Sequence, residues 1–265
     1  MSPAPEHEIR WPRRVRTVAE AVKYIDAAGY CTLFPVNNVP LPSLYYAVTR
    51  RNIQNIQEEF VWDRLTEMIW RWKDELPHRR RVFYAKYFRG RGSFISLEQL
   101  PNFLAMRESA AFPGDHDRFY SDGRIRDDAR VIWQALEEHG PMATLELRHA
   151  CKMETTAGNI RFRRAILDLQ CLLVAVRFGA EQETAAWKSG RYELTCRAFP
   201  KETAAARDIS PADARAKLAR KFLEWRPDVE PAKLARLFGW SKDEAAAAHA
   251  AARSEIPTRK TKGRK

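Results

Sequence analysis

Two adjacent amide side chains are the residues of this sequence best placed for chemistry. Asn37 and Asn38 stand in the segment TLFPVNNVPLP, between an apolar run and a proline-rich turn. An amide is uncharged, and it offers both hydrogen-bond donors and an acceptor. The segment therefore holds an uncharged, hydrogen-bonding pair at a rigid edge.

A short buried strand is predicted to hold these amides. Residues 33–36 are mostly apolar, and Pro40 and Pro42 forbid a longer strand because proline donates no ladder hydrogen bond. The helix predicted over residues 17–28, ended by Gly29, precedes this strand.

Strand geometry predicts which amide faces a cleft. Side chains alternate along a strand, so Pro35 and Asn37 share one face and Asn38 points to the other. A bulge at Pro35 would exchange the two amides. The structural alternative is a plain turn, because asparagine bonds its own backbone and tolerates unusual dihedral angles.

Composition points to a polyanionic partner. The chain has 265 residues, of which 45% are hydrophobic, and a net charge of +12 with a pI near 9.7. A chain of this length can bury a real core, and its basic excess favours nucleic acid. The sequence lacks an apolar run of membrane-spanning length and the apolar middle of a signal peptide, so we expect a cytoplasmic, soluble protein.

Metal, redox and nucleotide motifs are absent from the sequence. The four cysteines are far apart, and we interpret them as core residues. His116 lies between two aspartates in what we expect to be a solvated loop. We find no Gly-rich phosphate loop and no nucleophile elbow, so no metal or organic cofactor is expected.

The elements predict an α+β fold, mainly helical with small β-hairpins, built from tandem winged-helix or helix-turn-helix units. A first winged-helix-like unit, residues 17–113, has helices over residues 41–49 and 56–75 and a basic hairpin over residues 81–96. A polar connector, residues 114–126, leads to a second winged helix, residues 127–200, with helices over residues 129–139, 143–150 and 156–170 and strands over residues 172–178 and 191–197.

The two ends of the chain complete this organisation. Residues 1–16 form a basic arm, and residues 208–252 form a third helical unit with helices over residues 211–225, 231–238 and 241–252. We expect this unit to pack, or to contact the DNA backbone, rather than to read bases. Residues 253–265 hold six basic residues against Glu255 and are expected to form a disordered, phosphate-contacting tail.

With these elements in place, the chain resembles the AlkZ-like (AlkX/YcaQ) family of winged-helix DNA glycosylases, and its AlkZ-related subgroup most closely. The best-matching pieces are LEEHGPMATLEL, the segment WKDELP at residues 72–77, and TLFPVNNV. The family's strand carries a catalytic Gln-x-Gln or Gln-x-Asp motif. The resemblance places Pro35 at its first position and Asn37 at its second.

The resemblance therefore implies one surviving catalytic amide. Cleavage of an N-glycosidic bond passes through an oxocarbenium-like sugar that a positioned water attacks. The amide of Asn37 can hold such a water, and Asn38 is the competing residue. Residues considered for the surrounding pocket are Pro35, Leu41, Tyr45, Trp72 and Glu75. For Glu75 a buried salt bridge is the alternative, and for the aromatic residues it is a place in the core.

Basic residues are predicted to grip duplex phosphates from the hairpin tip, the third helix of the second winged helix and its wing. The predicted contacts are Arg79, Arg80, Arg81, Lys86, Arg89, Arg91, Arg161, Arg163, Arg164, Lys188 and Arg191.

The resemblance implies a monofunctional DNA glycosylase acting on double-stranded DNA. Its target would be a bulky, alkylated or hypermodified base, such as glucosylated hydroxymethylcytosine of phage DNA, in repair or phage defence. We expect a monomer associated with the bacterial nucleoid. The alternative is a non-enzymatic winged-helix regulator or lesion sensor that kept the scaffold without the Gln-x-Asp chemistry.

Overall fold

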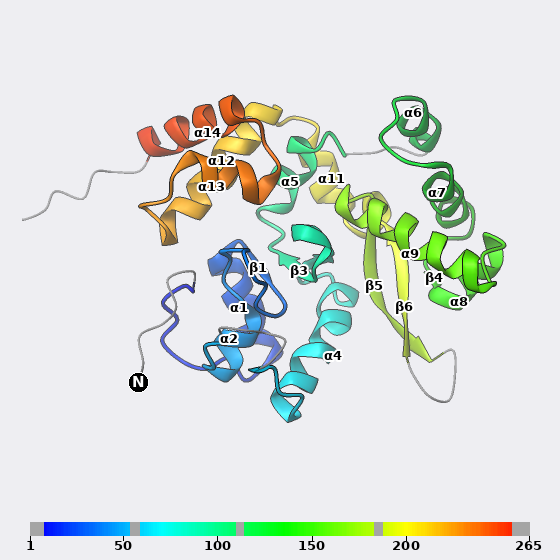
Figure 1. The fold of residues 1–265 in the computed structure, drawn as a ribbon, viewed down its shortest axis with the longest axis horizontal. Coiled ribbons are helices and arrows are strands. Elements are labelled where there is room, and N and C mark those ends of the chain that lie inside the picture. Colours follow the sequence, from blue (N-terminus) through cyan, green and yellow to red (C-terminus); the bar gives the residue numbers. More distant parts are fainter. Residues whose placement is uncertain (1–7, 54–58, 110–113, 183–187, 256–265) are drawn as a thin grey trace, which may run out of the picture.

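The computed structural model describes residues 8–53, 59–109, 114–182 and 188–255, and it confirms a mainly helical α+β fold with two small antiparallel sheets. In Figure 1, helices α12–α14 lie above α1 and β1 on the left of the view, and α6–α9 lie on the right. Helices α4 and α5 lie between these two groups. Within the described ranges, no helix is long and apolar enough to cross a membrane.

The first helix is specified by local signals. Helix α1, Val18–Ala28, begins with a capping box between Thr17 and Glu20, and Gly29 ends it with a φ of 77°. Both ends satisfy backbone groups that would otherwise lack partners. The helix predicted over residues 17–28 is confirmed.

The strand that follows is earlier and shorter than predicted. Strand β1 is Tyr30–Thr32, and residues 33–36 are not strand. The Leu33 N–H still donates to the carbonyl of Gly92 at 2.8 Å, but there the partner hairpin turns away. With no partner left, and with Pro35 unable to donate, the chain leaves the sheet.

Residues 33–42 instead form a loop whose two ends are fastened together. The Thr32 N–H donates to the Pro42 carbonyl at 2.9 Å, and the Tyr45 N–H donates to the Leu33 carbonyl at 3.1 Å. Helix α2, Leu44–Thr49, starts three residues later than predicted, where Ser43 caps it. The cap and the closed base fix the direction in which the loop leaves the core.

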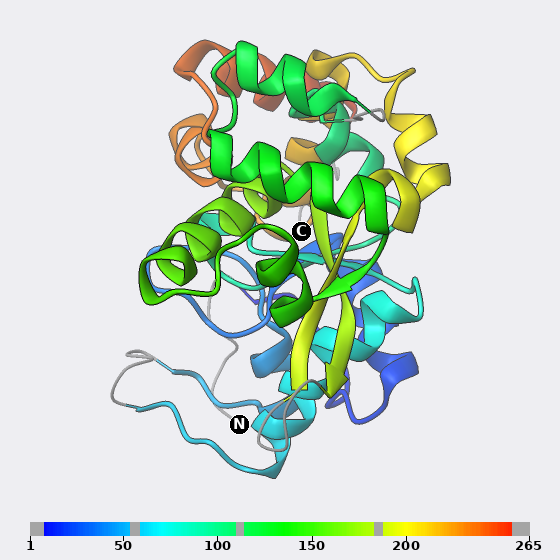
Figure 2. The same ribbon diagram turned by 90° about the vertical axis from the view of Figure 1, so that its right-hand side faces the viewer.

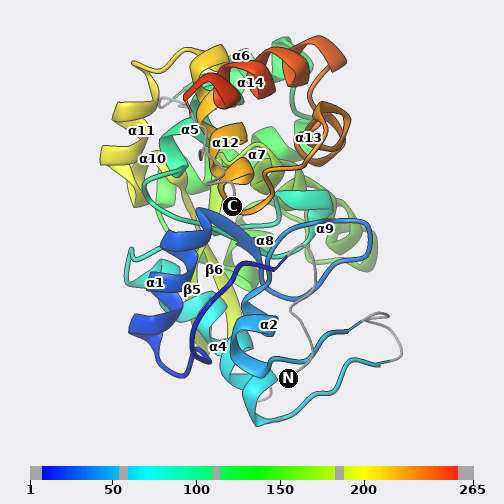
Figure 3. The ribbon, with the colours of Figure 1, turned by 90° about the vertical axis from the view of Figure 1, so that its left-hand side faces the viewer.

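The segment predicted as a basic arm is anchored beside this loop. Glu8 is buried and accepts hydrogen bonds from the Ser43 N–H at 3.1 Å, the Ser43 hydroxyl at 2.8 Å and the Tyr24 hydroxyl at 3.3 Å. Ile9 and Val15 are also buried. The described part of residues 1–16 therefore packs against α1 and α2, as the view of that face shows (Figure 3).

The next helix is shorter at its start than predicted. Helix α4, Arg64–His78, is capped by Asp63, whose carboxylate accepts from the Leu65 and Thr66 N–H groups. Pro77 lies in the last turn rather than beyond it, and the helix ends one residue later. Residues 56–58 of the predicted helix lie outside the described residues.

The predicted basic hairpin is present. Strands β2, Phe83–Ala85, and β3, Ser93–Ile95, flank the 3₁₀ turn η1, Phe88–Gly90, and the sheet order is β1-β3-β2. Arg89 lies at the tip in a left-handed conformation with a φ of 51°.

The predicted connector contains a helix. After α5, Leu100–Met106, helix α6, Asp115–Ser121, occupies most of residues 114–126 and carries His116. The polar composition of this segment led us to predict a connector, but one apolar residue anchors it. Phe119 is fully buried and packs on Trp133, with 5.1 Å between the ring centroids. Burial of that ring makes the segment a helix rather than a solvated loop.

The second unit has the predicted order of elements. These are α7, Asp127–His139; β4, Met142–Ala143; α8, Thr144–Ala150; α9, Thr156–Cys171; β5, Ala175–Gln182; and β6, Lys188–Leu194. The antiparallel sheet has the order β4-β6-β5, and the helices cover it in Figure 2. The assignment of both units as winged helices, and the predicted domain boundaries, remain predictions.

Strands β5 and β6 lie a few residues from the predicted positions. The chain turns at Leu173, whose φ is 61°, so β5 begins later than residue 172. Residues 195–197 were predicted as strand but lie in the short helix α10, Thr195–Ala198. The Thr195 hydroxyl donates to the Leu173 carbonyl and thereby ends the ladder.

The third unit follows the prediction closely. Helix α11, Pro200–Ala206, leads into α12, Pro211–Trp225, which Ser210 caps; α13, Pro231–Phe238, and α14, Lys242–Glu255, complete the unit. The Tyr30 hydroxyl donates to the Leu218 carbonyl of α12 at 2.9 Å, so this unit is joined to the first sheet.

Four buried rings form what we call the aromatic cluster: Tyr30 of β1, Phe88 of η1, Phe103 of α5 and Phe238 of α13. Each is 2% exposed or less. Tyr30 lies 5.9 Å from Phe88, 5.4 Å from Phe103 and 5.7 Å from Phe238 between ring centroids. Tyr30 packs edge-to-face on Phe103 and Phe238 and tilted on Phe88, and such ring contacts add to the free energy gained by burial.

A buried ion triad joins the first and second units. Asp74 of α4 pairs with Lys73 at 2.5 Å and with Arg177 of β5. Burial, followed by the nearby Arg177 guanidinium, lowers the pKa of Lys73 to about 8. The negative charge of Asp74 therefore partly compensates the positive charges of Lys73 and Arg177, where α4 meets β5.

The hydroxyl of Tyr30 provides a test of the aromatic cluster. Tyr30→Phe keeps the ring and loses one hydrogen bond, so we expect a loss of about 1 kcal/mol in the free energy of unfolding. Phe238→Ala removes a ring and should cost about 3–5 kcal/mol. Urea denaturation measures both, and equal losses would show that the hydroxyl, not ring packing, holds the third unit.

Glu8 makes stability depend on pH. Burial raises its pKa to about 7, from 4.5, even though hydrogen bonds from Ser43 and Tyr24 oppose the shift. Between these values the folded state keeps a proton that the unfolded state has lost, so stability falls as pH rises, by at most about 1.4 kcal/mol per pH unit. Glu8→Gln should flatten this part of the profile when unfolding is measured from pH 4.5 to 7. A slope that survives the substitution would assign it to another group.

Candidate functional site

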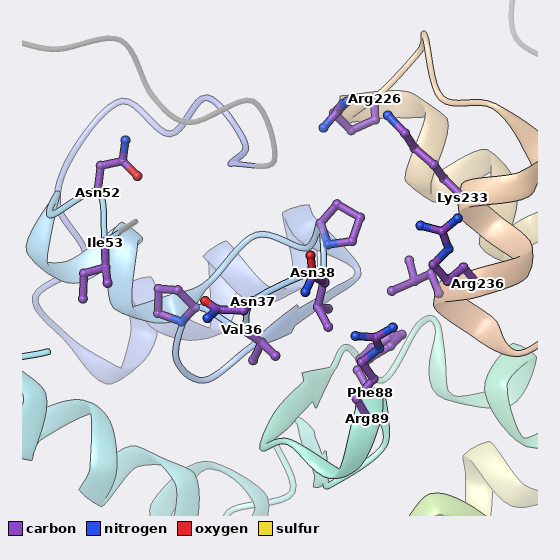
Figure 4. Close-up of a pocket in the computed structure, with 14 residues that line it drawn as sticks. Val36, Asn37, Asn38, Asn52, Ile53, Phe88, Arg89, Arg226, Lys233 and Arg236 are labelled. Atoms are coloured by element: carbon purple, nitrogen blue, oxygen red, sulfur yellow. The ribbon is translucent and has the colours of Figure 1, made fainter. Parts of the chain in front are cut away.

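A cavity of about 560 Å³ lies between the loop of residues 33–42, the hairpin tip and the third unit. Figure 4 shows the loop on one side, the residues of the third unit facing it, and Phe88 and Arg89 between them. Its lining residues are Pro35, Val36, Asn37, Asn38, Val39, Pro40, Asn52, Ile53, Phe88, Arg89, Arg226, Lys233, Arg236 and Leu237. The cavity thus brings together residues that are about two hundred positions apart in the sequence.

Asn37 and Asn38 occupy the centre of a tight turn. The Val39 N–H donates to the Val36 carbonyl at 3.0 Å, and Asn38 has a φ of 63°. Asparagine is among the few residues that adopt this left-handed conformation at low cost. The structural alternative of a turn is therefore correct for the backbone.

The turn changes which side chains share a face. We predicted from strand alternation that only one amide could face a cleft, and this prediction is wrong, because both Asn37 and Asn38 line the same cavity. Both residues are exposed, and their side chains make no hydrogen bond to any other described residue. Two adjacent amides are thus available to a ligand.

The base of the cavity is the protein core. Val39 and Phe88 are buried, and Val36 packs against the same core. Phe88 belongs to the aromatic cluster, so the cavity is built directly on it. An apolar base beneath polar walls is typical of sites that bind a flat organic group.

Four basic side chains form what we call the basic wall: Arg89, Arg226, Lys233 and Arg236. Arg89 comes from the hairpin tip, and the other three come from the end of α12 and from α13. Arg226 is 8% exposed and pairs with Asp228 at 3.5 Å, whereas Lys233 and Arg236 are exposed. Among the described residues that line the cavity, none carries a carboxylate.

Helix α13 points its two cations at the cavity because its other face is buried. Leu234 and Phe238 pack into the core, and Lys233 and Arg236, three residues apart, share the opposite side. We did not predict Arg226, Lys233 and Arg236 as site residues. Their spacing in PAKLARLF is the sequence signal that could have identified them.

The other predicted pocket residues lie away from the cavity. Leu41, Tyr45 and Trp72 are buried in the core, and none of them lines the cavity. Glu75 pairs with Arg79 at 2.8 Å, four residues along α4, so it forms a salt bridge, but a partly exposed one rather than the buried one of the alternative. Only Pro35 of this set joins the two amides.

Of the predicted DNA contacts, only Arg89 lines the cavity. Three others are engaged in ion pairs: Arg79 with Glu75, Arg161 with Asp128, and Arg191 with Glu181 at 3.3 Å. Arg80 is exposed, and its guanidinium lies 5.6 Å from the ring centroid of Phe178. The remaining exposed residues are Arg81, Lys86, Arg91, Arg163 and Arg164. Lys188 begins β6, and its side chain is outside the description.

The arrangement suits an anionic ligand that also carries hydrogen-bonding groups. Cationic side chains attract phosphate, and amides can hold a water or a polar edge. Across the described residues, no group of three or more His, Cys, Asp or Glu side chains could hold a metal ion.

Comparison with known proteins gives one family. The family model described as AlkZ related matches residues 15–239, a region that contains every residue lining the cavity. No curated protein matches the chain, and no solved structure matches it.

The conformation of Asn38 separates a backbone role from a side-chain role. Asn38→Gly should leave the free energy of unfolding within about 1 kcal/mol of the original, because glycine adopts a positive φ readily. Asn38→Val should cost about 1–3 kcal/mol from backbone strain. Urea denaturation compares them, and equal stabilities would show that the turn does not need the left-handed conformation.

Proposed function

This chain belongs to the AlkZ-related family, and on that premise we propose that it is a DNA glycosylase that hydrolyses the N-glycosidic bond of a modified base and leaves an abasic site. The family suggests a DNA glycosylase-like role. The observation that carries the proposal for this chain is the pair Asn37 and Asn38, which faces a basic wall across one cavity.

The amides supply the polar groups of the reaction. The bond to the base weakens, positive charge develops on the sugar, and a water attacks the anomeric carbon. We assign to the Asn37 carbonyl the task of holding that water, and to Asn38 a second hydrogen bond to the water or to the base. The described lining residues include no carboxylate, and we assign the positioning of the water to the two amides.

A flipped nucleotide fits the shape and charge of the site. Enzymes that act on a base inside duplex DNA extrude it into a pocket, and a cavity of about 560 Å³ lies within the usual range for small-molecule sites. The exposed Arg163 and Arg164 of α9, with Arg91 beside the hairpin tip, are proposed to hold the duplex phosphates on either side.

The proposed substrates are bulky, alkylated or hypermodified bases, among them glucosylated hydroxymethylcytosine of phage DNA. The protein would act in repair or in phage defence, as a monomer in the cytoplasm.

One observation favours a second candidate. The resemblance places Pro35 and Asn37 where the family is expected to carry Gln-x-Gln or Gln-x-Asp, and the described lining residues include no carboxylate. A lesion sensor or regulator that binds DNA without cleaving a bond fits those two facts. Base release is the measurement that separates it from a glycosylase.

The experiment uses duplexes with one unmodified, alkylated or glucosylated base at a fixed position. Treatment with the protein and then with alkali should cut one modified duplex at that position. Asn37→Ala should lower the rate of base release about 10²-fold or more, through loss of the water contact. Its affinity for a duplex with a tetrahydrofuran abasic analogue should stay within about threefold.

Asn38→Gly is the matched control because it keeps the turn and removes the second amide. A smaller loss for Asn38→Gly than for Asn37→Ala assigns the water to Asn37, and the reverse order assigns it to Asn38. If the unaltered protein binds the modified duplexes and leaves every base attached, the enzyme proposal is wrong and the sensor stands.

A further inference from the structure

We propose that the basic wall binds the phosphates that flank the target nucleotide, and that these phosphates supply negative charge to a cavity whose described lining has no carboxylate. The inference rests on the proposed function, since it takes DNA as the ligand of the cavity. It gives the third unit, expected from the sequence only to pack or to touch the backbone, a direct place in the site.

The position of the wall suits the backbone on both sides of one nucleotide. Arg89 comes from the hairpin of the first unit, and Lys233 and Arg236 come from α13 of the third. In Figure 4 the side chains of Lys233 and Arg236 lie across from Asn38, with Arg89 between the two sides. A nucleotide whose base reaches the amides would carry its phosphates past these three cations.

Arg226 of the wall pairs with Asp228, but the other three cations have no ion-pair partner among the described residues. Arg89, Lys233 and Arg236 form no ion pair with any carboxylate of the described residues, whereas Arg79, Arg161 and Arg191 do. Cations held on one cavity repel each other unless an anion lies between them. DNA carries one negative charge per phosphate, and a phosphodiester accepts hydrogen bonds from guanidinium and ammonium groups alike.

The wall is held rigidly, which is what a contact site for phosphate needs. Phe238 belongs to the aromatic cluster and stacks on Trp240 with ring centroids 4.4 Å apart. The carbonyl of Val229, in the turn before α13, lies 3.0 Å from His249 Nε2 of α14. Lys233 and Arg236 are therefore carried on a helix whose start and end are both fixed.

Bound phosphate also resolves an electrostatic conflict. The sugar becomes positively charged as the bond to the base breaks, and an empty basic wall would oppose that charge. Phosphates held between the wall and the sugar reverse the local sign. The substrate then provides the anion that a carboxylate provides in glycosidases with an acidic site.

The first test measures binding alone, on a duplex with a tetrahydrofuran abasic analogue, so that it needs no base release. Affinity is measured from 50 to 300 mM NaCl for the unaltered protein and for the double variant Lys233→Gln, Arg236→Gln. Two lost phosphate contacts should reduce the slope of log affinity against log salt by roughly 1.8, at about 0.9 per contact. Lys217→Gln, on the exposed face of α12 and outside the cavity lining, should leave the slope unchanged.

The second test locates the contact. A neutral methylphosphonate replaces each phosphate in turn near the abasic analogue. At a phosphate that the basic wall contacts, this replacement should lower the affinity of the unaltered protein about tenfold. It should lower the affinity of the double variant by less than twofold, because that variant has already lost the contact. Additive losses at every position, or a salt slope equal to that of the unaltered protein, would overturn the proposal.

Base release adds a readout that separates the two proposals. Where a modified duplex is cut, methylphosphonate at the phosphate that the basic wall contacts should lower kcat of the unaltered protein more than tenfold at saturating enzyme. Unchanged kcat overturns the electrostatic role of the phosphate. If no base is released but methylphosphonate weakens binding of the unaltered protein and not of the double variant, the proposed phosphate contact of the basic wall is supported and the glycosylase proposal is wrong.

Discussion

Burial of four aromatic rings is the constraint on which this site depends. Tyr30 sits at the start of β1, just before the amide loop; Phe88 is the neighbour of Arg89; and Phe238 closes the helix that carries Lys233 and Arg236. Phe103 fills the space between them, 6.0 Å from Phe88 and 6.1 Å from Phe238. The walls of the cavity are thus positioned from behind, by packing, and their polar side chains remain available to a ligand.

Backbone strain and charge repulsion at the polar surface of the cavity destabilise the fold, and the packing of the aromatic cluster must offset them. Asn38 and Arg89 are both non-glycine residues at positive φ, and both line the cavity. Arg89, Lys233 and Arg236, which form no ion pair within the described residues, add mutual repulsion. Strained backbone and uncompensated charge persist where the surrounding structure determines them strongly, and they concentrate at functional sites. Their coincidence here, on top of a fully buried aromatic cluster, distinguishes this cavity from the ordinary surface of the molecule.

The sequence predicted those elements whose signals are local. The capping box at Thr17, the cap at Ser210 and the glycine after α13 each specify a helix end within a few residues, and those helices are where we expected them. The strand predicted over residues 33–36 was wrong because a strand continues only as far as its partner does, and that partner lies about sixty residues away in the sequence. Tyr45 and Trp72 have the spacing of either a core or a stacking face, so only the packed structure separates the two. Prediction of the basic wall requires both the pattern in PAKLARLF and the tertiary position of α13. The local sequence does not determine that position.

The local geometry around Pro35 and Asn37 differs from that of a strand, to which the resemblance had assigned them. A strand presents residues i and i+2 on one face, which is the spacing of Gln-x-Gln or Gln-x-Asp. A turn instead can present two neighbouring residues to one cavity, and the two neighbours here are Asn37 and Asn38. Pro35 is then compatible with the site, because the position it occupies is part of a loop that needs no ladder hydrogen bond. We propose that a turn in place of a strand accounts for this pair: the motif positions fall on Pro35 and Asn37, and Asn38 supplies the second amide that lines the cavity.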